Sequence, residues 1–180
     1  MYDPLGRLLL TPVDRDAPER VARLRALGLG DRPEPAFDAL ARDLALLTGA
    51  PYAMVNFIGE ERQFFAGLYE RPGGGRGTGA GPGLGRVMAR HQGYCPHVVV
   101  RRRALVLEDV RDFPRFAPNA FADEIGIRSY LGAPLLDGTG MALGTVCAAD
   151  TEPRRWGSPG LDTVKSFAAE LTARIHGHAS

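Results

Sequence analysis

A pair of apolar segments towards the C-terminal end places the strongest constraint on how this 180-residue chain can fold. Residues 129–136 and 141–150 are rich in apolar, β-branched and aromatic side chains, and residues 137–140 between them read Asp-Gly-Thr-Gly. Glycine and aspartate tolerate the backbone of a tight reversal, so the sequence predicts a β-hairpin. The second segment is apolar on both faces, which is typical of a strand with a neighbour on each side. We therefore expect residues 141–150 to lie at the centre of a sheet.

The N-terminal part of the chain is expected to hold a tail and a first helix. Residues 1–15 show no regular apolar pattern and are predicted to form a flexible tail. Asp16 followed by Glu19 fits a capping box, which marks the start of a helix within residues 16–30. Gly28 is a typical helix stop, so we expect this helix to end there.

A second helix and a second hairpin are predicted next. Residues 35–48 carry apolar side chains at helical spacing, and Gly49 is placed to end the helix. Residues 52–58 and 63–68 are two β-rich runs joined by a turn that contains glycine. We expect these runs to pair and to extend the sheet formed by the first hairpin.

A glycine-rich segment follows the second predicted hairpin. Residues 71–86 hold eight glycines and two prolines among sixteen residues. Such a segment has no apolar face to bury, so burial cannot offset the entropy lost on ordering it. It also lacks the Gly-x-x-x-x-Gly-Lys-Ser/Thr pattern of a phosphate-binding loop. We expect a mobile loop here.

The middle of the chain is expected to contain short elements. Residues 87–103 are predicted to form a short helical segment that presents Tyr94, Cys95 and His97 to the sheet. A short strand is predicted at residues 104–107. An irregular segment with several prolines and phenylalanines follows, and helical residues resume ahead of the central hairpin.

The last predicted element is a helix that begins at Ser158 and Pro159. One face of it carries apolar residues separated by steps of three and four, namely Leu161, Val164, Ala168, Leu171 and Ile175. This stripe fits a helix-pairing seam between two copies of the chain, and it also fits a helix that packs on the sheet. We predict a homodimer through the terminal helices, with the sheet-packed helix as the open alternative.

The balance of charge bears on the partners of the chain. It has 22 basic and 21 acidic residues, so no overall field favours nucleic acid or an anionic membrane surface. No apolar run is as long as a membrane span, and the N-terminus lacks the pattern of a signal peptide. The two cysteines lie far apart in sequence, which is typical of free thiols in a reducing compartment. We therefore expect a cytoplasmic protein without nucleic-acid or membrane partners.

Five short segments of the chain form a recognisable series. They read PAFD (35–38), GEERQFF (59–65), YCPH (94–97), DFPRF (112–116, shortly after Asp109) and GTVC (144–147). In this order they resemble the GAF family of small-molecule-sensing domains, and the chain resembles a stand-alone bacterial GAF protein with its domain at residues 31–177. The resemblance implies an α+β fold, in which terminal helices cover one face of an antiparallel sheet of five or six strands. Loops and short helices then roof a pocket on the other face.

The implied pocket gives a set of candidate ligand-binding residues. They are Tyr94, Cys95, His97, Asp109, Phe113, Phe116 and Tyr130. Aromatic rings with one polar tip suit a pocket that is mostly apolar and orients its ligand by few hydrogen bonds. Phe113 and Phe116 also fit anchors that hold their loop to the core, and Asp109 also fits a cap of the following turn.

Cys95 is open to two interpretations. It is flanked by His91 and His97, either of which suits stabilisation of a thiolate. It also fits a small apolar filler, which we favour, and Cys147 on the central strand is expected to be a core residue. The spacing of the histidines and Cys95 does not match a zinc site, so we expect no metal.

Three functions fit these observations. The first is a sensory or regulatory domain that binds a small molecule and acts through contacts with a signalling protein. The second, implied by resemblance to free methionine sulfoxide reductases, is a redox enzyme for which only Cys95 and Cys147 are available. The third is a haem or bilin carrier that uses His97 or Cys95, although the motifs surrounding such sites are absent. We adopt the first function, and we expect neither enzyme activity nor a bound cofactor.

Overall fold

The computed structural model describes residues 11–73, 83–116 and 119–177 of the chain. Within these residues, six strands form one antiparallel sheet in the order β3-β2-β1-β6-β5-β4, which confirms the predicted α+β fold. The strands are β1 (Tyr52–Ile58), β2 (Arg62–Glu70), β3 (Val87–Ala89), β4 (Leu105–Leu107), β5 (Ser129–Leu136) and β6 (Ala142–Asp150). The helices are α1 (Ala17–Ala26), α2 (Pro35–Thr48), α3 (Cys95–Arg101), the 3-10 helix η1 (Val110–Asp112), α4 (Ala120–Ile125) and α5 (Gly157–Gly177).

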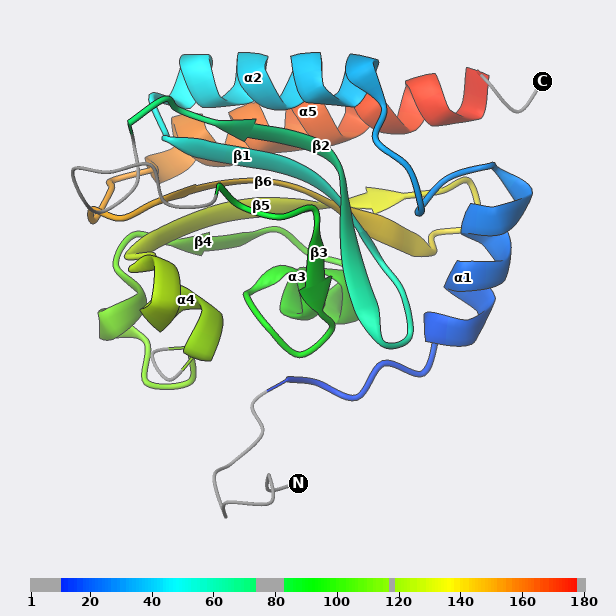
Figure 1. Ribbon diagram of the computed structural model, residues 1–180, viewed down its shortest axis with the longest axis horizontal. Helices are drawn as coiled ribbons and strands as arrows, with labels where there is room; N and C mark the ends of the chain where they lie inside the picture. The colour runs from blue at the N-terminus through cyan, green and yellow to red at the C-terminus, as the bar shows by residue number, and fades with distance from the viewer. Residues whose placement is uncertain (1–10, 74–82, 117–118, 178–180) are drawn as a thin grey trace.

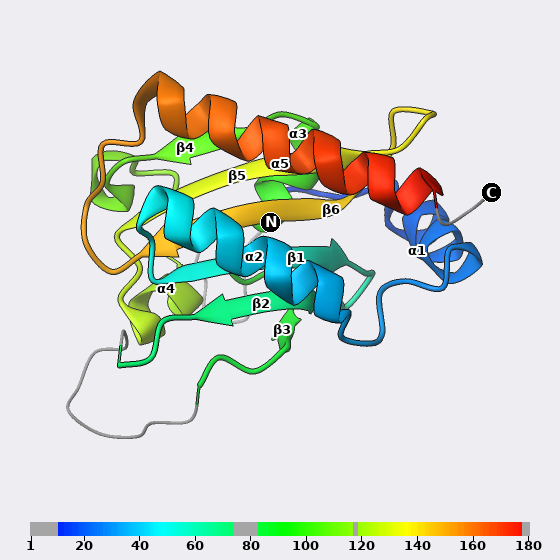
Figure 2. The same cartoon turned by 90° about the horizontal axis from the view of Figure 1, so that it is seen from above.

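Long helices cover one face of the sheet and short helices the other. α2 and α5 lie side by side on the face that we call the back (Figure 1, Figure 2). α3 and α4 lie on the opposite face, the front (Figure 1). Side chains alternate between the two faces, so Val55 and Phe57 of β1 join the back core while Met54 and Ile58 join the front core. Among the described helices, none has both the length and the apolar character needed to cross a membrane.

The predicted central hairpin is formed by β5 and β6. β6 lies between β5 and β1, and every residue of it is buried, which confirms the prediction of a central strand. In the turn, the Asp137 carboxylate accepts hydrogen bonds from the backbone N–H groups of Thr139 and Met141. Gly140 has a φ of +84°, in the left-handed region that favours glycine. The turn residues therefore fix the register of the hairpin.

The apolar stripe of the last helix packs on the sheet of its own chain. Val164, Ala168, Leu171 and Ile175 of α5 are buried in the back core, and Leu161 is half-buried. Two arrangements were considered for this stripe. Within the single chain, the stripe packs on the sheet. The homodimer stays a prediction.

The start of α1 differs from the predicted capping box. Asp16 has helical backbone angles, and its side chain makes no capping hydrogen bond. Its carboxylate instead pairs with Arg102 at 2.8 Å. The capping-box prediction is wrong because a guanidinium from the end of α3 takes the carboxylate. The helix itself is present, and Gly28 follows its end with a φ of +67°.

Two arginines attach α1 to the central hairpin. Arg20 is fully buried, and its guanidinium donates to the carbonyl oxygen of Ala142 at 3.0 Å and pairs with Asp14 at 2.6 Å. Arg23 binds Asp137 in the hairpin turn. α1 is therefore tied to the start of β6.

Two predicted flexible segments lie wholly or partly outside the described residues. Residues 1–10 of the predicted tail are not among them, whereas Thr11 at its end donates to the carbonyl oxygen of His91 at 2.9 Å. Residues 74–82 of the predicted glycine-rich loop are also outside the described part of the chain.

The sequence prediction misses strand β3. We expected helical structure across residues 87–103, but β3 pairs with β2 along Arg62, Gln63 and Phe64, and α3 begins only at Cys95. A strand of three residues carries too short a pattern to be recognised. Residues 87–89 adopt the strand conformation because they form hydrogen bonds with the edge of β2.

Candidate ligand site

A small cavity lies on the front of the sheet, where the resemblance placed a pocket. Its volume is about 30 Å³. Strands β1, β2, β3, β5 and β6 form its floor, and residues at the start of α3 and the end of α4 form its cover. The lining includes Met54, Met88, Tyr94, Cys95, Ile125 and Tyr130.

Two of the predicted aromatic residues, Tyr94 and Tyr130, line this cavity, and a third, Phe116, packs against Tyr94 without lining it. The ring centroids of Tyr94 and Tyr130 lie 5.3 Å apart, and those of Tyr94 and Phe116 lie 6.2 Å apart. Gly132 leaves room for the Tyr130 ring, because a Cβ at this position would collide with the Tyr130 hydroxyl. The structure thus brings together aromatic residues that are separated by up to 36 positions in the chain, Tyr94 and Tyr130.

Two buried polar atoms near the start of α3 have no hydrogen-bond partner among the described residues. They are the Tyr94 hydroxyl oxygen and Nδ1 of His97. Burial, with the negative charge of Asp123, raises the pKa of Tyr94 well above its ordinary value, so its hydroxyl stays protonated. The His97 ring packs edge-on against Phe116 with the centroids 4.9 Å apart. Because buried polar groups are nearly always hydrogen-bonded, these atoms are natural partners for a bound molecule.

The two cysteines form a close pair. Cys95 Sγ lies 3.7 Å from Cys147 Sγ and 3.1 Å from the hydroxyl oxygen of Tyr130. The hydrogen bond with Cys147 lowers the pKa of Cys95 to about 6, with help from neighbouring hydroxyl and amide groups and against the opposing effect of burial. The same pairing raises the pKa of Cys147. Both thiols are buried, as expected, but they are partners and not separate fillers.

His97 makes the stability of the fold depend on pH. Burial, with the charges of Arg115 and Arg101, lowers the pKa of His97 to about 4. A histidine in the unfolded chain has a pKa of about 6.5, so between pH 6.5 and 4 the unfolded state binds the proton and the folded state does not. We expect the free energy of unfolding to decrease as the pH is lowered from 6.5 to 4. The decrease should be roughly 3 kcal/mol larger in the wild type than in His97→Gln. Urea unfolding at a series of pH values measures the difference, and parallel pH profiles would contradict it.

Four of the predicted site residues do not line the cavity, namely His97, Asp109, Phe113 and Phe116. The Asp109 carboxylate accepts a hydrogen bond from the Arg111 N–H at 3.1 Å and pairs with Arg128 Nε at 3.0 Å. It therefore caps η1, which is the alternative role that the sequence left open, and its hydrogen bond with Arg128 lowers its pKa. Phe113 is 39% exposed, whereas Phe116 is buried and packs against Tyr94, and neither is part of the cavity lining.

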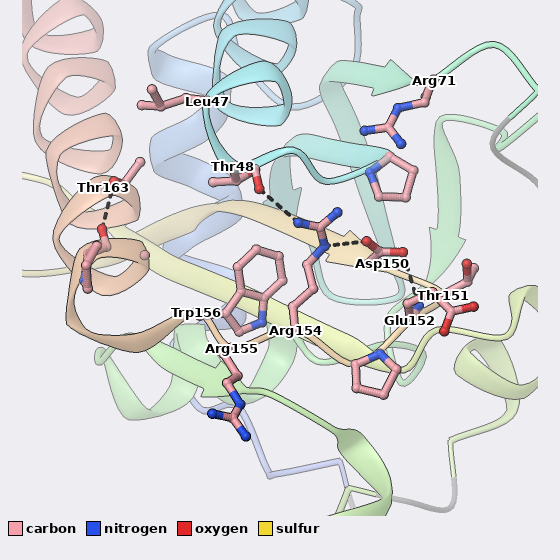
Figure 3. Close-up of a pocket in the computed structure, with 14 residues that line it drawn as sticks. Leu47, Thr48, Arg71, Asp150, Thr151, Glu152, Arg154, Arg155, Trp156 and Thr163 are labelled. Atoms are coloured by element: carbon pink, nitrogen blue, oxygen red, sulfur yellow. Dashed lines mark hydrogen bonds and ion pairs between the residues drawn. The ribbon is translucent and has the colours of Figure 1, made fainter.

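A larger hollow of about 720 Å³ lies where α2 ends beside the start of α5 (Figure 3). Arg154 donates from this hollow to the carbonyl oxygens of Thr48 and Gly49 at 3.0 and 2.6 Å, and it pairs with Asp150. Arg71 donates to the same Gly49 oxygen at 2.6 Å. These contacts satisfy carbonyl groups that a helix leaves free at its C-terminal end. The arginines here serve the fold of α2.

Sequence reasoning identified Cys95 but missed its pairing with Cys147. Cys147 lies opposite Met54 in the β1–β6 register, and the side chains of both residues point to the front face. The alternation of side chains along a strand can therefore predict the face on which Cys147 lies. It cannot predict which residue of the cover packs against Cys147. Among the described residues, no group of three or more His, Cys, Asp or Glu side chains is arranged to bind a metal ion.

The six-stranded sheet, with long helices on its back and short helices over its front, corresponds to one known domain family. The GAF domain family model matches residues 32–175 of the chain. The chain therefore belongs to the GAF domain family.

Known proteins similar to this chain include two enzymes and the GAF domain of a third. A cyclic di-GMP phosphodiesterase of Pseudomonas aeruginosa is 29% identical over 171 residues, which are 92% of this chain but only 27% of that protein's length. The GAF domain of an Acinetobacter phosphoenolpyruvate-protein phosphotransferase matches 93% of this chain and 94% of its own, with a TM-score of 0.57 and 14% identity. A free methionine-R-sulfoxide reductase from Neisseria meningitidis matches 93% of this chain and 94% of its own, with a TM-score of 0.61 and 15% identity. At these identities the two solved structures show a shared fold alone.

Proposed function

We propose that this chain is a regulatory GAF module that binds a small molecule in the front cavity. The observation that carries the proposal is the apolar front cavity, whose lining includes Tyr94, a residue with a buried hydroxyl that lacks a partner among the described residues. Tyr94 lies within a mostly apolar front core that also contains Met54 and Tyr130. Ligand sites in proteins are typically apolar with a few hydrogen-bonding groups that orient the guest.

The size of the cavity sets a condition on binding. A volume of about 30 Å³ holds little more than one water molecule, so a larger guest needs the cover to move. The floor is fixed by the hydrogen bonds of the sheet, whereas Ile125 in the cover belongs to the six-residue helix α4. We infer that α4 moves away from the sheet when a ligand enters, which gives binding a structural consequence on the surface.

The relatives suggest how such a change is used. One protein similar to this chain is named as a cyclic di-GMP phosphodiesterase, and another is a domain of a phosphotransferase. We propose that this module likewise influences a signalling enzyme, through contacts made when its cavity fills. Its own role in this proposal is binding and not turnover.

Methionine methyl groups provide a direct test of ligand binding. Met54 and Met88 line the cavity, whereas Met141 follows the β5–β6 turn and does not. With methyl-¹³C methionine, titration with phenol and indole as probes should shift the Met54 and Met88 signals and leave Met141 unchanged. Ring currents from an aromatic probe act only on methyl groups close to it, so Met141 is an internal control.

The variant Ala149→Leu fills space at the cavity floor, because Ala149 also lines the cavity. It should abolish the shifts of Met54 and Met88 while leaving Met141 in its folded position. If neither probe shifts Met54 or Met88 in the wild-type chain, or if all three methyl groups shift together, the proposed cavity site is wrong.

A further inference from the structure

The two buried cysteines lie in direct contact with each other, which burial alone would not require. Cys95 begins α3 and Cys147 lies on β6, 52 positions apart in the sequence, yet their sulfur atoms are separated by 3.7 Å. A disulfide bond needs a separation of about 2.05 Å, so a small change in side-chain torsion angles brings the sulfurs within bonding range. Both are free thiols in the structure.

We propose that Cys95 and Cys147 form a redox site, at which a small hydroperoxide such as hydrogen peroxide converts the two thiols to a disulfide. This proposal does not rest on the ligand-binding function, because the reaction requires only the two thiols and an oxidant. The thiol assay described below and the methyl titration therefore succeed or fail independently.

Cys95 is the sulfur that reacts first. It lines the cavity, whereas Cys147 does not, so an oxidant inside the cavity meets Cys95. The Tyr130 hydroxyl lies 3.1 Å from Cys95 Sγ, and burial raises the pKa of Tyr130 well above its ordinary value. Tyr130 therefore stays protonated and donates its hydrogen bond to the Cys95 thiolate.

The titratable groups that act on Cys95 come from the two strands beneath it. They are Tyr130 on β5 and Cys147 on β6, and both stabilise the thiolate by hydrogen bonds. The thiolate and not the thiol is the nucleophile towards peroxides. The arrangement thus favours the reactive form of Cys95 near neutral pH.

The reaction balances in two steps. The Cys95 thiolate attacks one oxygen of the peroxide, the O–O bond breaks, and an S–O bond forms to give a sulfenic acid and hydroxide, which takes up a proton to become water. Cys147 then attacks the sulfur of Cys95, an S–S bond forms, and hydroxide leaves and becomes water with the proton released by Cys147. The two thiols lose two electrons, and hydrogen peroxide gains them and yields two molecules of water.

The cavity volume selects the oxidant by size. About 30 Å³ accommodates a molecule close to water in size, such as hydrogen peroxide. Methionine sulfoxide is much larger and, like phenol or indole, enters only after α4 moves away from the sheet, whereas hydrogen peroxide does not need that movement. The chemistry that the site supports in this form is therefore oxidation by a small peroxide.

Disulfide formation alters the cover of the cavity. It ties the start of α3 covalently to β6. Tyr94 directly precedes Cys95 and His97 follows it by two residues, so both belong to the segment that the bond restrains. Oxidation therefore restrains the α3 part of the cover, whereas we expect ligand entry to move α4.

A thiol count on the full chain tests the proposal. The reduced protein is treated with one equivalent of hydrogen peroxide, then alkylated and analysed by intact mass. We expect both thiols to be lost together, the mass to fall by two hydrogen atoms, and dithiothreitol to restore the thiols. Cys147→Ser should stop at a sulfenic acid that dimedone traps, and Cys95→Ser should not react.

The pH profile separates a reactive pair from a merely buried one. The rate should rise with pH through about 6 in the folded chain, where the Cys95 thiolate forms, and through about 8.5 in urea-unfolded chain. Tyr130→Phe removes the hydroxyl that positions the thiolate, so it should react about tenfold more slowly at pH 7, with a profile displaced to higher pH.

Several results would overturn the proposal. Both thiols could remain titratable after peroxide treatment, Cys95→Ser could lose Cys147 as fast as the wild type does, or the disulfide could link two chains on a non-reducing gel. Oxidation by free methionine sulfoxide at a rate comparable to that by peroxide would overturn the size argument and indicate a reductase.

Discussion

Replacing Gly144 with alanine should lower the free energy of unfolding by roughly 3 to 5 kcal/mol. Gly144 lies in the central strand β6, opposite Phe57 of β1 and Leu135 of β5. A Cβ at this position would collide with the backbone carbonyl oxygen of Asn56. The obstacle is backbone held by hydrogen bonds on both sides, so neither strand can move away without breaking its pairing.

The matched control for this substitution is Gly138→Ala in the hairpin turn. A Cβ at Gly138 meets no atom within 4 Å. We expect a change within about 0.5 kcal/mol. Urea unfolding followed by the fluorescence of Trp156, which is the only tryptophan of the chain and is buried, measures both variants. Equal midpoints for the two variants would show that close packing at Gly144 is not required.

Removing the carboxylate of Asp14 should also have a large effect. We expect the free energy of unfolding to decrease by about 3 to 5 kcal/mol. Arg20 is fully buried and pairs with Asp14 at 2.6 Å, and Arg90 approaches the same carboxylate at 3.0 Å. Asp14→Ala leaves the Arg20 guanidinium inside the protein without its counter-charge. A buried charge that loses its partner destabilises the fold far more than an exposed one does.

Asp16→Ala, two residues along the chain, is the control for Asp14→Ala. Asp16 pairs with Arg102, but both side chains are about half exposed, at 44% and 45%. Such pairs contribute about 0 to 1 kcal/mol. The double variant Asp14→Ala with Arg20→Met should recover much of the lost stability, because it removes the stranded charge as well. If Asp14→Ala and Asp16→Ala unfold at the same urea concentration, the buried Asp14–Arg20 ion pair does not stabilise the fold more than an exposed pair does.

The parts of the fold that the sequence predicts are those governed by local patterns. The central hairpin follows from two apolar runs around Asp137 and Gly140, and α2 follows from its helical spacing and the glycine at its end, Gly49, which has a φ of +72°. In each case the residues that determine the structure are neighbours in the chain. The GAF fold then follows from the order of these elements.

The features that the sequence does not predict depend on contacts between distant residues. Asp16 has the sequence position of a helix cap, but Arg102 arrives from α3 and takes its carboxylate. β3 is a strand only because the edge of β2 supplies hydrogen bonds. A sequence pattern within one segment cannot predict such contacts, because the partner residue comes from a distant part of the chain.

The candidate site divides along the same line. Tyr94, Cys95 and Tyr130 were identified because aromatic and thiol groups suit a pocket, and all three line the cavity. His97, Asp109, Phe113 and Phe116 were also predicted by residue type, but they do not line the cavity. For Asp109 the reason is that its carboxylate, at the start of η1, pairs with Arg128. Residue type indicates which chemistry is available, whereas the path of the cover decides which side chains meet.

The attachment of α1 to the hairpin has a mechanical consequence. Arg20 holds the carbonyl oxygen of Ala142 at the first residue of β6, and Cys147 lies five residues further along the same strand, about 17 Å away. A strand that is hydrogen-bonded to a neighbour on each side resists bending. A displacement of α1 is therefore expected to shift β6, on which Cys147 lies. We therefore expect a displacement of α1 to be transmitted along β6 to the Cys95–Cys147 pair.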